Sequence, residues 1–186
     1  VAALDGGGWR CVSGDLAVRY DPQPTADRRG AWMCGTDPAG RQGLWKLDLS
    51  GEKAPVFIAP DAGCILVSPD DSQAFVWKSE EGVYATSWGG GQRFAQIYGK
   101  TSGPPELVDL RTGERRATEL ATAGTLLWSP DGTSYVWKEA KGEAWFRWKL
   151  GAPKPETLPF PAEVRRQSWS PDGKKLAFVG DFDGGE

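Results

Sequence analysis

The chain has 186 residues, with 22 basic and 25 acidic side chains and no histidine, for a net charge of -3. This length suits one well-buried domain rather than two. Balanced charge without a basic run gives no sign of a nucleic-acid or anionic-membrane partner, and no apolar stretch reaches the roughly 18 residues of a membrane span. Because histidine is absent, Ser-His-Asp triads, Cys-His pairs and imidazole metal sites are excluded.

The composition is typical of an all-β protein. Gly (25 residues), Pro (14) and Trp (10) indicate many turns and short apolar strands filled by large aromatic side chains. No window sustains a helical period, and Pro104, Pro105 and Gly113 disfavour a helix between them. The chain starts at Val1 with neither a Met nor a targeting signal, so we expect a processed chain or a fragment of a longer protein.

The predicted elements form a repeat of four strands, named A to D. In the first repeat, at 15–60, the strands are expected at 16–20, 31–34, 43–49 and 55–58. In the second, at 61–121, they are expected at 64–67, 72–78, 106–110 and 117–120. In the third, at 122–162, they are expected at 125–128, 133–138, 145–150 and 156–158. Strands A and B of a last repeat fall within 163–182.

A short turn joins strands A and B. Its copies are Ser68-Pro69-Asp70-Asp71, Ser129-Pro130-Asp131-Gly132 and Ser170-Pro171-Asp172-Gly173. Pro presets the backbone φ, Ser and Asp bond to the backbone, and Gly accepts a positive φ, so turn chemistry explains the motif without a ligand. The spacing from Pro130 to Pro171 matches the roughly 40 to 50 residues of a propeller blade.

This repeat resembles the TolB-like class of β-propellers, a WD-like family in which an apolar strand ends in Ser-Pro-Asp-Gly and a Leu-Ala-Phe strand follows. Residues Ser170 to Phe178 match that pattern, and Asp48 to Gly51 and Asp109 to Gly113 resemble its third strand and turn. The resemblance covers nearly the whole chain. It implies a propeller fold, but the same fold hosts unrelated activities, so it says little about function.

Strand counting predicts one domain, 1–186, built as a propeller of four blades of four antiparallel strands. The last blade, begun by 163–182, is expected to gain strands C and D from residues 1–13. Closure within the chain is favoured because consecutive elements usually pair locally. Residues 1–13 could instead complete a neighbouring chain, which would build rings or fibres.

An inserted hairpin is predicted near residues 82–99 of the second repeat, around Gly89, Gly90 and Gly91. A fifth blade that includes this stretch is the open alternative. Trp88 lies beside the glycines, where an aromatic side chain on a loop suits a partner contact, and Gln92 and Arg93 would add polar groups. The competing interpretation is a hairpin that folds back on the ring.

No catalytic residue, metal or cofactor is predicted. Paired carboxylates can hydrolyse glycosides, but most Asp residues lie in the repeated turns, where turn chemistry explains them. Asp181 and Asp183 are weak calcium candidates because the spaced oxygen ligands of a complete loop are missing. The turn also resembles the Asp-box of sialidases, but its aromatic residue falls later and no Arg cluster accompanies it.

The cysteines and tryptophans are predicted to be structural. Cys11, Cys34 and Cys64 show no CxxC spacing and allow at most one disulfide, and a role as small buried apolar residues is favoured. Tryptophans recur at equivalent positions of strands A and B and are expected to fill the space between blades; they are Trp77, Trp128, Trp137 and Trp169.

These features favour a non-enzymatic scaffold that binds a protein or peptide partner on one face of the ring. The resemblance implies this role and also a periplasmic or extracellular location in the bacterial cell envelope. Two alternatives stay open: a structural protein that assembles by exchange of terminal strands, and an accessory or glycan-binding propeller of a larger enzyme. Neither a nucleic-acid partner nor membrane insertion is expected.

Overall fold

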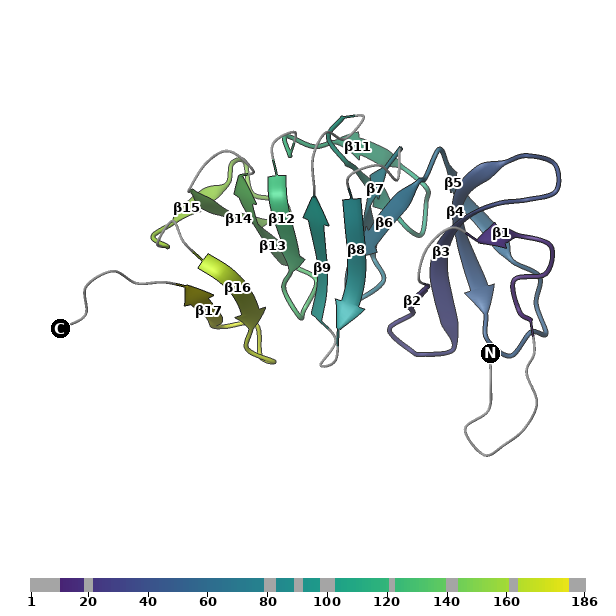
Figure 1. The fold of residues 1–186 in the computed structure, drawn as a ribbon, viewed down its shortest axis with the longest axis horizontal. Helices are drawn as coiled ribbons and strands as arrows, with labels where there is room; N and C mark the ends of the chain where they lie inside the picture. Colours follow the sequence, from purple (N-terminus) through teal and green to yellow (C-terminus); the bar gives the residue numbers. More distant parts are fainter. Residues whose placement is uncertain are drawn as a thin grey trace.

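The computed structural model is all-β and antiparallel, which confirms the predicted fold class. It describes residues 11–18, 22–78, 83–88, 92–97, 103–120, 123–139, 144–160 and 164–180. These residues contain no helix of the length and hydrophobicity needed to cross a bilayer. The strands form four sheets that follow one another along the long axis of the molecule (Figure 1).

The first sheet is centred on its longest strands. Its members are β1 (Ala17–Val18), β2 (Gln23–Pro24), β3 (Gly30–Thr36), β4 (Gln42–Asp48) and β5 (Val56–Pro60). Strand β3 pairs with β1, β2 and β4, and β5 completes the sheet beside β4. Two short strands thus occupy the region in which one strand A was predicted, on either side of Pro22.

The second sheet has the predicted order of four strands. They are β6 (Cys64–Val67), β7 (Gln73–Trp77), β10 (Glu106–Asp109) and β11 (Arg115–Ala117). Strand β7 pairs with β6 on one side and β10 on the other, and β11 lies at the outer edge. Because β6 and β10 occupy both edges of β7, the residues that follow β7 add no strand beside it.

The third sheet takes up the inserted hairpin. It contains β8 (Val83–Trp88), β9 (Gln92–Ile97), β12 (Ala123–Trp128), β13 (Ser134–Glu139), β14 (Trp145–Lys149) and β15 (Glu156–Leu158). Strands β8 and β9 form the expected hairpin, but β9 pairs with β12 of the next repeat, where an edge is free. Figure 1 shows the hairpin in the middle of the molecule.

The fourth sheet consists of β16 (Val164–Trp169) and β17 (Leu176–Gly180). Within the described residues these strands pair only with each other. Of the segment predicted to complete this blade, residues 1–10 lie outside the described part of the chain, and 11–13 form no strand. Closure of the ring and the number of blades therefore stay predictions.

Apolar side chains alternate along the strands and join neighbouring sheets. In β6, Ile65 and Val67 pack towards the first sheet, whereas Cys64 and Leu66 pack towards the third. A strand that is buried on both faces needs apolar residues at every position, and β6 has them. The sheets therefore stack face to face, with one apolar layer between each successive pair.

The repeated tryptophans lie in these layers, as predicted. Trp77 and Trp128 are 1% exposed, and Trp137 and Trp169 are 7% and 6% exposed. The outer face of the first sheet is covered differently. There Val12 and Leu16 pack against Met33, Trp45 and Leu47, so the segment before β1 caps this end of the stack.

Candidate functional site

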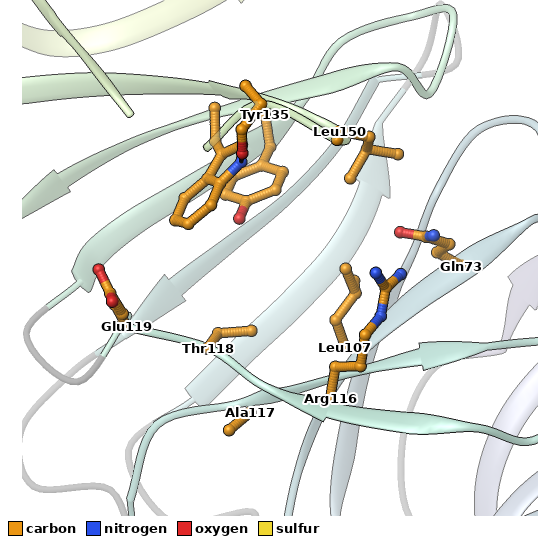
Figure 2. Close-up of a pocket in the computed structure, with 11 residues that line it drawn as sticks. Gln73, Leu107, Arg116, Ala117, Thr118, Glu119, Tyr135 and Leu150 are labelled. Atoms are coloured by element: carbon orange, nitrogen blue, oxygen red, sulfur yellow. Dashed lines mark hydrogen bonds between the residues drawn. The ribbon is translucent and has the colours of Figure 1, made fainter. Parts of the chain in front are cut away.

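A cavity with a volume of about 480 Å³ lies between the second and third sheets. We call it the inter-sheet pocket. Residues 116–119 of the second sheet and 150–152 of the third form two of its walls, and its other lining residues are Gln73, Leu107, Tyr135 and Trp148. Figure 2 shows side chains from both sheets converging on this space.

An aromatic pair forms one side of the pocket. Tyr135 and Trp148 are directly opposite each other on β13 and β14, so their side chains share one face of the sheet. Their ring centroids are 6.4 Å apart with an interplanar angle of 26°. The Trp148 indole nitrogen donates a hydrogen bond to the Ala152 carbonyl at 3.1 Å, which fixes the ring.

The core holds Tyr135 rigidly. Its ring packs edge-on against Phe75 at 4.8 Å and Trp128 at 5.4 Å, and the residue is only 4% exposed. Burial raises the pKa of Tyr135 above its ordinary value, so the hydroxyl stays protonated at neutral pH. In Figure 2 this hydroxyl points into the pocket.

Polar groups in the pocket are left without partners. The Tyr135 hydroxyl and the Arg116 guanidinium form neither a hydrogen bond nor an ion pair with the described residues. The side-chain oxygen of Gln73 is buried and has no hydrogen-bond partner. Because an unsatisfied buried acceptor costs free energy, a ligand that donates a hydrogen bond there would gain affinity.

The predicted binding residues lie away from this pocket. Trp88 is the last residue of β8 and is paired with Gln92 across the hairpin; its side chain lies outside the described part of the structure. The Gln92 amide donates hydrogen bonds to the Ser168 hydroxyl and, at 3.0 Å, to the Trp169 carbonyl. Gln92 therefore joins β9 to β16 of the fourth sheet.

Arg93 joins β9 to the first two sheets. It is 5% exposed and donates hydrogen bonds to the Ser68 carbonyl at 3.0 Å and the Pro24 carbonyl at 2.6 Å. Its guanidinium lies 3.6 Å from the Asp71 carboxylate. Burial lowers the pKa of Arg93, and the carboxylates of Asp71 and Asp70 oppose that shift. These bonds give Arg93 a structural role.

The repeated Asp residues are engaged in their own turns. The Ser129 hydroxyl donates to Asp131 at 2.6 Å, and this bond is the main reason that the pKa of Asp131 lies below its ordinary value. Asp70 and Asp172 accept equivalent bonds from Ser68 and Ser170. In the described part of the chain no group of His, Cys, Asp and Glu could hold a metal ion. Asp181 and Asp183 lie outside that part.

The cysteines follow the sequence prediction in two of three cases. Cys34 and Cys64 are buried and are not joined in a disulfide, as expected of small apolar residues. Cys11 is not in a disulfide either but is exposed, so the prediction of burial is wrong there. The reason is that Cys11 precedes the capping residues Val12 and Leu16 instead of lying in a strand.

The pocket residues carry a weak sequence signal. Tyr135 and Trp148 stand in predicted strands, but 13 positions of sequence separate them, and only the register of β13 and β14 places them opposite each other. Residues 116–119 comprise the end of the short edge strand β11 and the two residues after it, and they carry no motif. Alternation along strands could have marked these side chains as sharing a face, but not the gap between two sheets.

Comparison with known proteins supports the fold. No protein-family model matches the chain, and no curated protein matches it. Among solved structures, the crystal structure of TolB from Acinetobacter baumannii superposes with a TM-score of 0.52 at 20% sequence identity. The match covers 89% of this chain and 38% of that TolB chain, so this chain spans well under half of the length of TolB. At this identity the match concerns the fold alone.

Proposed function

Starting from its TolB-like β-propeller fold, we propose that the chain is a non-enzymatic protein-interaction module that binds a peptide segment of a partner in the inter-sheet pocket. The observation that carries this proposal is a rigid aromatic pair beside polar groups that have no partner among the residues that the structure describes. Pockets with apolar walls and a few placed polar groups are the usual ligand sites of proteins. The predicted location in the bacterial cell envelope, periplasmic or extracellular, belongs to the same proposal.

Blocking the pocket tests the proposal. Peptides are selected on the immobilised chain from a random dodecapeptide phage library, and the best binder is then measured by fluorescence anisotropy. Ala117 is exposed and lines the pocket, so Ala117→Trp is expected to abolish binding. Ala39 is exposed in the turn between β3 and β4, and Ala39→Trp serves as the matched control with unchanged binding.

A second variant separates binding from folding. Tyr135→Phe removes a hydroxyl that bonds to no described residue, so the urea unfolding midpoint should stay unchanged. Peptide affinity should fall about fivefold, the usual worth of one neutral hydrogen bond. If no peptide binds, while chitohexaose binds and Ala117→Trp abolishes that binding, the pocket is a glycan site and the proposal is wrong.

We also propose Trp88 as a partner contact outside the pocket. It stands at the end of β8, beside the turn of the inserted hairpin. Gln92 and Arg93 were predicted to contact a partner together with Trp88. Their side chains instead donate hydrogen bonds to other sheets, so they add no available polar group beside Trp88. Peptide binding that survives Ala117→Trp is expected to depend on Trp88.

A further inference from the structure

We propose that the inter-sheet pocket selects a peptide segment that carries both signs of charge, with an acidic group facing Arg116 and a basic group facing Glu119. This inference rests on the proposed function, because it names the kind of peptide that the pocket takes. It depends on two charges that form no ion pair with the described residues and on the apolar and aromatic side chains that line the pocket with them.

Arg116 and Glu119 stand at opposite sides of the pocket in Figure 2. Both side chains are exposed, and neither forms an ion pair within the described residues. Their charges act in opposite directions on the pKa of Tyr135, lowered by Arg116 and raised by Glu119, so both lie within electrostatic range of its hydroxyl. The electrostatic field in the pocket is therefore directed from Arg116 towards Glu119.

Charges on neighbouring strands of the same two sheets, by contrast, form ion pairs. The Arg115 guanidinium lies 2.5 Å from Glu106, and that of Arg147 lies 2.7 Å from Glu156. Successive side chains of a strand point to opposite faces, so Arg115 and Arg116 on β11 lie on opposite faces of the second sheet. Arg115 also bonds to the Pro60 carbonyl of the first sheet, whereas Arg116 lines the pocket towards the third.

Apolar and aromatic side chains line the pocket beside the two charges, and Thr118 lies between these charges in Figure 2. In Figure 2 Leu107 lies beside Arg116, and Tyr135 and Leu150 line the pocket across from the segment that carries the two charges. A ligand with one charge only would pair with one of the two groups and leave the other to solvent. Like charges placed at the wrong end would repel, which gives the pocket a preferred direction of binding.

Exchanging the two charges tests this inference. Peptides are selected from the random dodecapeptide library on the wild type and on the double variant Arg116→Glu/Glu119→Arg. On the wild type we expect peptides with an acidic and a basic residue at a fixed separation around an apolar residue. On the double variant we expect the same pair in reversed order along the peptide.

A binding cycle assigns the acidic contact. Arg116→Gln should weaken the selected peptide about threefold, as for an exposed ion pair, and should have no further effect on a peptide whose acidic residue is replaced by Gln or Asn. Arg111→Gln, in the exposed turn after β10, is the matched control and should leave affinity unchanged.

The outcomes separate this inference from the function on which it rests. Peptides that bind in the pocket without a charge pair, or with the same charge order on both proteins, overturn the inference and leave the proposed function standing. Absence of any peptide that Ala117→Trp displaces overturns the proposed function itself. Circular dichroism confirms that each variant is folded, which is expected because the exchanged side chains are exposed.

Discussion

At the scale of single residues, Asp71 departs from the repeated turn motif and connects its turn to the first sheet and to the hairpin. It stands where the other turns have Gly132 and Gly173, and it keeps their left-handed backbone with φ of 59°. Its carboxylate accepts hydrogen bonds from the Ala26 amide at 2.6 Å and the Trp32 indole at 3.0 Å, and it faces Arg93. The strained conformation is offset by contacts to the first sheet and to the hairpin.

The variant Asp71→Gly tests whether the backbone strain at this position or the contacts of its carboxylate has the larger effect on stability. Glycine would relieve roughly 1 kcal/mol of backbone strain, but the variant would leave the buried Arg93 without its carboxylate. We expect a net loss of about 1 to 3 kcal/mol in the free energy of unfolding, measured with urea. Asp71→Asn keeps hydrogen-bonding groups and tolerates a positive φ, so it should lose less. A stabilised Asp71→Gly protein would show that strain dominates.

At the scale of elements, the Ser-Pro-Asp turns of successive repeats stack on each other. A side chain on Gly132 would bring its Cβ within 2.6 Å of the Asp70 carboxylate in the preceding turn. Glycine is therefore required at position 132 for two reasons: its φ is 69°, and the Asp70 carboxylate approaches its Cα closely. The turn motif encodes contact between repeats as well as the turn itself.

Gly132→Ala measures that contact. The variant should lose about 2 to 3 kcal/mol of unfolding free energy, because it combines the left-handed cost of a Cβ with a clash. Gly40→Ala is the matched control: φ is 81° at Gly40, but nothing lies within 4 Å of the added atom. It should lose only about 1 kcal/mol. Equal losses for the two variants would show that turn stacking adds nothing.

Sequence patterns predicted the elements better than their partners. The Ser-Pro-Asp turns marked β6–β7, β12–β13 and β16–β17, because the turn chemistry is local. The three glycines marked the hairpin of β8 and β9, but its pairing with β12 depends on which sheet edge is free, and a local pattern does not contain that information. The pocket was not predicted for the same reason: it lies between two sheets, and a local pattern does not show which sheets are neighbours.

At the scale of the whole molecule, the two ends of the stack differ. Val12 and Leu16 cover the outer face of the first sheet, whereas Val179 on β17 is 65% exposed and its strand pairs, within the described residues, only with β16. Capping of a terminal repeat protects a stacked array from association. The β17 end, with an exposed apolar residue on an edge strand, has less protection.

If residues 1–13 do not close this blade within the chain, self-association through β17 is the expected consequence. Light scattering over a wide concentration range should show a mass that grows with concentration, and Val179→Lys should suppress this growth because a charged edge resists pairing. Val56, which is 54% exposed on β5 in the first sheet, provides the control, and Val56→Lys should behave like the wild type. A constant monomer mass would instead favour closure by residues 1–13.

The position of β9 also affects how the molecule unfolds. Stacked repeats that touch only their neighbours can unravel one unit at a time from either end. Here one strand is hydrogen-bonded to β12, Gln92 reaches the fourth sheet, and Arg93 reaches the first and second. We therefore expect β9 to oppose stepwise unravelling, so that the four sheets unfold in one cooperative melting transition.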